Sequence, residues 1–256
     1  MAKIISVVNQ KGGVGKTTTS INLGAYLAHL GKFVLLVDID PQANATSGLG
    51  IDPKDVQNGI YEALIGAMRM RNIIVSTSVS GYKLAPANIS LAGASVELVN
   101  QENREFLLSS ALMEVRNDYD YIIIDCPPSL GLLTINGLVS SDEVLIPVQA
   151  EYYALEGLGQ LLNTINMVRE HIKPELAVKG VVLTMFDKRN KLSGEVMNEI
   201  YRYFPNKIFR SVIPRNVRLA EAPSHAQAIS EYDPGSKGGR AYERLAREIL
   251  ESEVYV

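Results

Sequence analysis

The chain has 256 residues, of which 46% are hydrophobic and 21% are charged, and its formal net charge is −3. This composition excludes a disordered chain, and the length fits one large α/β domain spanning residues 1–256. Its single cysteine, Cys126, excludes an intrachain disulfide and a cysteine-rich zinc site. No apolar run reaches the ~18 residues of a membrane helix, and the N-terminus lacks a signal-peptide core. We therefore predict a soluble cytoplasmic protein.

Short β-branched runs alternate along the chain with stretches of helical periodicity. Several runs are apolar at successive residues, which is typical of parallel strands covered on both faces. The predicted strands are Lys3–Val8, Phe33–Val37, Lys83–Pro86, Tyr121–Ile124, Val144–Val148, Lys179–Met185 and Ile208–Ile213. The predicted helices are Thr17–Leu30, Ser95–Val115, Leu155–His171, Ser193–Phe204 and Arg240–Glu251. This order predicts an α/β fold with a doubly wound, mostly parallel sheet and helices on both faces, and with surface excursions at Pro53–Ile73 and Asp187–Lys191.

The residues between the first predicted strand and the first predicted helix have the composition of a phosphate-binding loop. They read Gln10-Lys11-Gly12-Gly13-Val14-Gly15-Lys16-Thr17-Thr18. Glycines let backbone N–H groups converge on phosphate oxygens, and the helix N-terminus adds the positive end of its dipole. Lys16 would supply charge to the β/γ-phosphates, and the Thr17 hydroxyl would ligate Mg²⁺. The usual G-x-x-x-x-G-K-[ST] pattern is altered, because Gln10 stands at the first glycine position.

Two further predicted strands end in aspartates. Asp38 and Asp40 follow one apolar strand, and their spacing places them on one side if the strand geometry continues. Asp125 follows Tyr121–Ile124 in a Walker B arrangement, which predicts that it holds Mg²⁺ through water. The carboxyl ends of strands form the ligand crevice of open α/β sheets. We therefore expect one of Asp38 and Asp40 near the metal and the other near an attacking water.

The segment Lys11-Gly12-Gly13-Val14-Gly15-Lys16-Thr17 resembles the deviant Walker A motif of the ParA/MinD group of P-loop ATPases. The resemblance implies that residues 11–18 bind ATP with Mg²⁺, and no guanine-recognition signature argues for GTP. It implies that Lys11 reaches across an ATP-dependent homodimer to the partner's nucleotide, as an arginine finger does. Lys16 and Asp40 are the other expected catalytic residues, with Asp40 positioning the hydrolytic water. Asp38 is expected to be an outer-shell metal group or a structural group.

Longer segments resemble the ParA/Soj branch, which partitions chromosomes or plasmids. These segments are Val37–Gly50, Pro147–Gly157 and Val212–His225. The resemblance implies that Pro214 and Asn216 lie beside the adenine. Because the chain starts at its first predicted strand, it is similar to the short form, which has no separate operator-reading domain. The branch further implies that the ATP-bound dimer binds DNA without sequence preference on the nucleoid, and that a ParB/Spo0J-type partner stimulates hydrolysis.

Charge is distributed unevenly in a way that fits DNA as a partner. From Lys188 to Arg247 there are 12 Lys/Arg and 6 Asp/Glu, a net +6, so the rest of the chain carries −9. Lysine and arginine that neutralise phosphates bind DNA of any sequence. The candidate DNA contacts are Arg189, Arg218, Lys237 and Arg240, of which Arg189 and Arg218 lie at positions that resemble those of the family's DNA-contact arginines.

Three rival functions remain to be weighed. A MinD-type membrane-cycling ATPase ends in a basic amphipathic helix, whereas the acidic end Glu251–Val256 would be repelled by anionic lipid, so we predict no membrane partner. A reductase like the nitrogenase iron protein requires two cluster-binding cysteines per chain, and this chain has one. A metabolic P-loop synthetase that phosphorylates a small carboxylate would need a substrate pocket beside the phosphates, and no residue set in the sequence indicates one.

Overall fold

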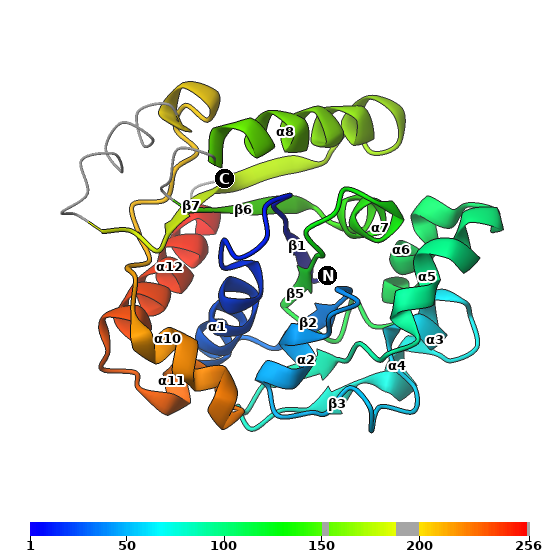
Figure 1. Ribbon diagram of the computed structural model, residues 1–256, viewed down its shortest axis with the longest axis horizontal. Coiled ribbons are helices and arrows are strands. Elements are labelled where there is room, and N and C mark those ends of the chain that lie inside the picture. The colour runs from blue at the N-terminus through cyan, green and yellow to red at the C-terminus, as the bar shows by residue number, and fades with distance from the viewer. Residues whose placement is uncertain (150–153, 188–199, 255–256) are drawn as a thin grey trace.

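The computed structural model describes residues 1–149, 154–187 and 200–254, and its strands form one sheet (Figure 1). The strands are β1 (Lys3–Val7), β2 (Val34–Asp38), β3 (Val75–Ser76), β4 (Tyr82–Ala85), β5 (Tyr121–Asp125), β6 (Glu143–Gln149) and β7 (Ala177–Thr184). Their order in the sheet is β3-β4-β2-β5-β1-β6-β7. Of the described strands, only β3 is antiparallel to its neighbour. The predicted doubly wound, mostly parallel sheet is confirmed.

Helices cover both faces of this sheet. One face packs against α1 (Lys16–His29), α2 (Asn44–Gly48), α10 (Val217–Glu221), α11 (Ile229–Tyr232) and α12 (Lys237–Val254). The other packs against α3 (Ile60–Leu64), α4 (Met70–Ile73), α5 (Leu91–Glu97), α6 (Leu107–Met113), α7 (Leu132–Ser140) and α8 (Ala154–His171). In β5, Tyr121 and Ile123 pack into the hydrophobic core on the α1 and α12 face. Ile122 and Ile124 pack into the core on the α7 and α8 face. This two-sided burial explains why the strands are apolar at successive positions.

The prediction of one helix over Ser95–Val115 is wrong, because the segment is interrupted by non-α-helical residues in its middle. After α5 come two short 3₁₀ turns, Leu98–Asn100 and Arg104–Phe106, and then α6. Asn103, with φ of 53°, takes the left-handed conformation that ends regular right-handed structure. The helix α7, which follows directly after Gly131, was not predicted.

The predicted strand Ile208–Ile213 is also wrong, although the segment touches β7. Phe209 N–H donates to Val181 O at 2.9 Å and Ile213 N–H donates to Leu183 O at 2.8 Å. Between them, the N–H groups of Arg210 and Ser211 donate to the Glu248 carboxylate of α12 at 2.7 and 2.9 Å. A side chain therefore takes the Ser211 N–H, which a continuous ladder from Phe209 to β7 would need.

The segment Pro53–Ile73 lies partly in the core, which corrects the expected surface excursion. Its helices α3 and α4 bury Ile60, Met70 and Ile73 to 2% exposure or less. Residues 188–199 lie outside the described residues, so Arg189 and most of the predicted helix Ser193–Phe204 are not placed. Among the residues that are placed, none of the helices combines the length and apolarity needed to cross a membrane.

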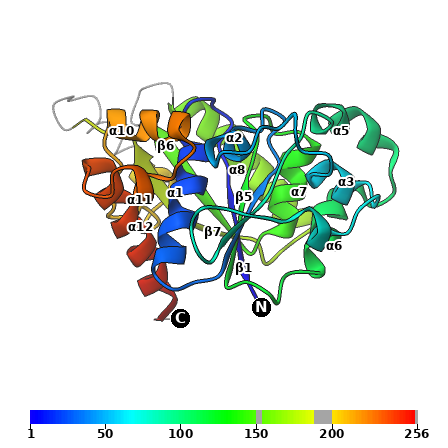
Figure 2. The same ribbon diagram turned by 90° about the horizontal axis from the view of Figure 1, so that it is seen from below.

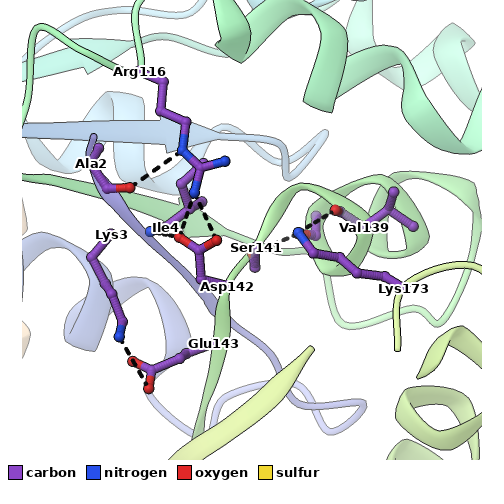
Figure 3. Close-up of polar contacts among 10 residues, drawn as sticks. Ala2, Lys3, Ile4, Arg116, Val139, Ser141, Asp142, Glu143 and Lys173 are labelled. Atoms are coloured by element: carbon purple, nitrogen blue, oxygen red, sulfur yellow. Dashed lines mark hydrogen bonds and ion pairs between the residues drawn. The ribbon is translucent and has the colours of Figure 1, made fainter. Parts of the chain in front are cut away.

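Charged side chains pair at the amino ends of the strands (Figure 3). Arg116 Nη2 donates to both carboxylate oxygens of Asp142, at 2.7 and 2.9 Å. Asp142 also accepts the Ile4 N–H of β1 at 2.9 Å. Beside them, Glu143 lies 3.5 Å from Lys3 Nζ and 3.1 Å from Lys179 Nζ. These contacts fix the start of β1 against β6 on the edge opposite the loop between β1 and α1.

Candidate functional site

The loop between β1 and α1 depends on glycine for its shape. Gly13 and Gly15 have φ of 73° and 89°, in the left-handed region that residues with a Cβ rarely adopt. Gly15 is the N-cap of α1 and has no side chain that could cap the helix. The first N–H groups of a helix have no partners within it. The sequence thus ends the loop at a helix N-terminus suited to an anion.

A cleft of ≈ 610 Å³ lies at the carboxyl edge of the sheet. Figure 2 shows α2 and α10 at one edge of the molecule and both chain ends at the opposite edge. The residues predicted for a nucleotide that line the cleft are Gly12, Gly13, Gly15, Lys16, Thr17, Thr18 and Asp40. Lining residues that sequence reasoning missed include Asn22, Gln42, Ser47, Met185, Pro223 and Gln227. The fold therefore brings the phosphate-loop motif and one predicted aspartate to a shared hollow.

Lys16 lies between the loop and the carboxylates. Its residue is 7% exposed, and Nζ donates to the Lys11 carbonyl oxygen at 3.1 Å. Burial lowers the pKa of the Lys16 ammonium, while the charges of Asp125 and Asp40 oppose that change. The arrangement holds a cation at the floor of the cleft, where phosphate oxygens would meet it.

Asp125 and two hydroxyl groups of α1 form an oxygen-rich cluster beside Lys16. Thr17 Oγ1 donates to Asp125 Oδ2 at 2.7 Å, and Ser20 Oγ donates to Oδ1 at 2.7 Å. Burial raises the pKa of Asp125 to about 6, although both hydroxyls lower it. Carboxylate and hydroxyl oxygens are ligands suited to Mg²⁺. The donor set of Thr17 and Asp125 therefore fits that metal.

The two aspartates after β2 face different surroundings. Asp38 is fully buried, and its Oδ2 accepts the N–H and the hydroxyl of Thr46, both at 2.8 Å. Burial, reinforced by the nearby Asp125, raises the pKa of Asp38 to about 7. Asp40 lines the cleft, and its Oδ1 accepts the Gln42 N–H at 2.9 Å. The contacts give Asp38 a structural role in holding α2; its outer-shell metal role stays a prediction.

A second cavity of ≈ 210 Å³ adjoins the cleft and shares Gly15, Thr18 and Met185 with it. Pro214 and Asn216, predicted to lie beside the adenine, both line this cavity. The end of β7 also lines this cavity and was not predicted from the sequence. The carboxyl end of a predicted parallel strand is a signal for a ligand-binding position, so this one could have been found. There, Thr184 Oγ1 donates to the Val14 carbonyl at 2.7 Å and so anchors the loop.

The described DNA candidates lie on α10 and at the start of α12. Arg218, whose side chain is 50% exposed, lies 2.9 Å from Glu221 and 3.4 Å from Asp233. Lys237 and Arg240 are exposed on α12. The two helices pack closely, since a Cβ at Gly238 would lie 2.6 Å from Leu219 Cγ. The three basic residues therefore belong to neighbouring elements.

Comparison with known proteins decides the family. Residues 2–178 match a family described as an AAA domain. The chain is 57% identical over 249 residues to the sporulation initiation inhibitor protein Soj of Bacillus subtilis, covering 97% of this chain and 98% of that protein. It is 50% identical over 250 residues to the chromosome-partitioning ATPase Soj of Treponema pallidum, covering 98% of each. The chain belongs to the ParA/Soj family of partitioning ATPases.

One solved structure that is similar to this ParA/Soj chain contains a nucleotide and magnesium. The structure of cobyrinic acid a,c-diamide synthase from Mycobacterium smegmatis with bound ADP and magnesium is 38% identical, with a TM-score of 0.88, and covers 100% of this chain and 96% of that one. The resemblance to the ParA/Soj branch is thus confirmed, and the protein is an ATPase. Nucleotide and Mg²⁺ are the ligands of the family, while the roles of individual residues stay predictions.

Proposed function

We propose that this ATPase is a Mg-ATP-dependent switch of chromosome or plasmid partitioning. ATP closes a homodimer that binds DNA of any sequence on the nucleoid, and a ParB/Spo0J-type partner stimulates hydrolysis and release. The whole chain, residues 1–256, acts as one ATPase domain. The observation that carries the proposal is the meeting of Lys16, Thr17 and Asp40 with the buried Asp125 at one edge of the sheet.

The described contacts support a division of labour in the site. Residues 12–18 and the start of α1 hold the phosphates, with Lys16 as their cation. Thr17 would hold Mg²⁺ directly and Asp125 through water, and the metal neutralises phosphate charge when bound. Asp40, facing the cleft, orients the attacking water. Lys11 of the partner subunit supplies positive charge to the transferring phosphoryl group.

The position of α10 supports a link between nucleotide and DNA. Asn216, the N-cap of α10, lines the second cavity together with Leu219 and Ala220 of the helix, while Arg218 of the helix is half exposed. Nucleotide contact with α10 therefore reaches the element that presents a DNA-contact arginine. A dimer doubles the number of phosphate contacts, which makes affinity rise steeply and fall with salt.

The test is DNA binding by the purified protein with ADP, with ATP, and with ATP at raised salt. We expect ATP-dependent binding that ignores sequence and collapses with salt, and we expect Arg218→Glu to weaken it while ATP-dependent dimerisation persists. Arg71→Glu is the matched control, because Arg71 is a similarly exposed, ion-paired arginine of α4. An ATP-bound dimer that ignores DNA but binds anionic vesicles would contradict the proposal and favour a MinD-type role.

A metabolic activity is the second candidate, because the solved structure described above is named as a synthase. The partitioning role has stronger support, since the relative with 57% identity over 97% of the chain is a Soj protein. One assay of ATP turnover distinguishes the synthase activity from the partitioning role. ATP turnover that depends on cobyrinic acid favours the synthase, and turnover that depends on DNA and a ParB-type protein favours partitioning.

A further inference from the structure

Asn9 joins the end of β1 to the phosphate loop. The residue is 4% exposed, and both ends of its side-chain amide are used. Oδ1 accepts the Lys11 N–H at 2.9 Å, and Nδ2 donates to the Pro147 carbonyl of β6 at 2.7 Å. A buried amide with partners at both ends fixes the backbone on either side of it.

The Asn9 side chain extends the hydrogen bonding between β1 and β6 beyond the last main-chain bond between them. The last main-chain bond between β1 and β6 in this direction is Val8 N–H to Leu145 O, at 3.1 Å. At the following position the Asn9 side chain, in place of a main-chain N–H, reaches β6 at Pro147. The Lys11 peptide is thereby tied through one side chain to a central strand of the sheet.

The carbonyl side of Lys11 has a different partner. Lys16 Nζ donates to the Lys11 carbonyl at 3.1 Å. The function proposed above has the Lys16 ammonium contact phosphate oxygens of ATP, which compete for its hydrogen bonds. The contact from Asn9 to the Lys11 N–H involves neither the Lys16 ammonium nor any of residues 12–18, which the proposed function assigns to the phosphates bound by the same chain. Asn9 is thus suited to hold Lys11 when ATP is present.

We infer that Asn9 is a positioning residue for Lys11, fixing the backbone from which the lysine reaches the partner subunit's nucleotide. This inference rests on the proposed role of Lys11 across the dimer. The residue type follows from the geometry, because the side chain must accept from one N–H and donate to one carbonyl at short range, and aspartate lacks the donor. A reacting group displaced by about 1 Å costs on the order of 10²-fold in rate.

Mixed dimers test where Asn9 acts. One chain carries Lys11→Ala and keeps its own Asp40; the other carries Asp40→Ala and keeps Lys11. Only the site of the first chain, served by the lysine of the second, hydrolyses ATP, so an equal mixture should show about a quarter of wild-type turnover in a two-fold dimer. Without such turnover, both the action of Lys11 across the dimer and the role of Asn9 are overturned.

Asn9→Ala is then added to one chain at a time. In the lysine-donating chain it should lower turnover about tenfold or more, because Lys11 loses its anchor. In the Lys11→Ala chain it should change turnover less than about twofold, because that chain has no lysine to position. Equal losses in both chains, or a loss only in the Lys11→Ala chain, would overturn the inference and leave the Lys11 role intact.

Two further variants separate positioning from folding. Asn9→Ser keeps a short acceptor for the Lys11 N–H, so it should recover part of the turnover and serves if the alanine variant fails to fold. Gln160→Ala in the donating chain removes a different side-chain bond of the loop, Gln10 Nε2 to Gln160 Oε1 at 2.6 Å, and should leave turnover unchanged. KM for ATP should stay within about threefold in every Asn9 variant, since the fall is in kcat.

Discussion

The two edges of the sheet surround their carboxylates with different partners. At the amino edge, Asp142 pairs with Arg116 and Glu143 pairs with Lys3 (Figure 3). Glu143 also pairs with Lys179, so each carboxylate meets a cation. At the carboxyl edge, the fully buried Asp38 and Asp125 accept hydrogen bonds mainly from hydroxyl and backbone N–H groups. Burial raises the pKa of Asp38 to about 7 and that of Asp125 to about 6.

The contrast shows that the amino edge contributes to stability, whereas the carboxyl edge contains groups that lower it. Paired charges at the amino edge hold β1 and β6 together and have no further chemistry to perform. Buried carboxylates whose charged form is disfavoured lower stability, and such groups gather where a ligand is to be bound. Substitutions at the carboxyl edge should therefore change nucleotide affinity, and substitutions at the amino edge should change the free energy of unfolding.

The largest effect should come from Lys16→Ala, which removes the cation of the carboxyl edge. Truncating one partner of a desolvated charge pair costs about 2–5 kcal/mol, so ATP affinity should fall on the order of 10²-fold or more. Lys173→Ala is the matched control, because Lys173 Nζ also donates to a main-chain carbonyl, that of Val139, at 2.9 Å. Titration with a fluorescent ATP analogue measures both, and equal affinities would break the comparison.

Asp142→Ala should act in the reverse sense, lowering stability and sparing nucleotide affinity. It leaves Arg116 and the Ile4 N–H without their carboxylate in a partly buried site, which should cost about 2 kcal/mol of unfolding free energy. Asp118→Ala, which breaks the more exposed pair with Arg71, should cost less than about 1 kcal/mol. Urea unfolding tests both variants; a shared loss would show that depth of burial does not matter here.

The pH dependence of stability should reveal the buried carboxyls of the other edge. The pKa of Asp38 is about 7 in the folded protein, against an ordinary value of 3.8 for an exposed aspartate, so between these values the folded state binds more protons than the unfolded state. Stability due to this group is therefore highest at low pH and falls as pH rises toward 7, by at most about 1.4 kcal/mol per pH unit. Asp38→Asn should flatten this slope in nucleotide-free protein, and parallel curves would refute the assignment.

How far the sequence predicts the molecule depends on the range of the interactions involved. The sheet follows from contiguous apolar runs, and Lys16, Asp40 and Asp125 follow from short motifs at strand ends. The segment Ile208–Ile213 could not be predicted, because Glu248 of α12 takes two of its backbone donors. Such a contact depends on tertiary packing and leaves no local pattern.

The same reasoning applies within the site. The structural contacts of Asp38 are made with Thr46, whose hydroxyl also accepts the Ala87 N–H at 2.9 Å. Met185 and Gln227 reach the cleft from segments without a motif, so only the fold brings them there. Motifs thus predict the residues that contact phosphate, whereas the supporting contacts require the structure.

The smallest effect concerns exposed ion pairs near the nucleotide edge. Arg218 pairs with Glu221 at 2.9 Å, with side chains 50% and 38% exposed, whereas the Arg116–Asp142 pair is 32% and 29% exposed. An exposed pair is weak and exchanges readily with another anion. Glu221→Gln should therefore leave stability within about 0.5 kcal/mol and, by removing a carboxylate that competes with DNA phosphates, raise ATP-dependent DNA affinity a few-fold at low salt.

Glu243→Gln is the matched control for that variant, since Glu243 pairs with a different arginine, Arg247, at 2.8 Å on α12. If both variants raised DNA affinity equally, the gain would reflect net charge alone, and the pair on α10 would have no special place beside DNA. A gain confined to Glu221→Gln, and lost when Arg218→Glu is added, would show that this arginine exchanges its intramolecular carboxylate for phosphate. The exposed Arg218–Glu221 pair would then differ from the Arg116–Asp142 pair at the amino edge because its arginine exchanges a carboxylate partner for a DNA phosphate.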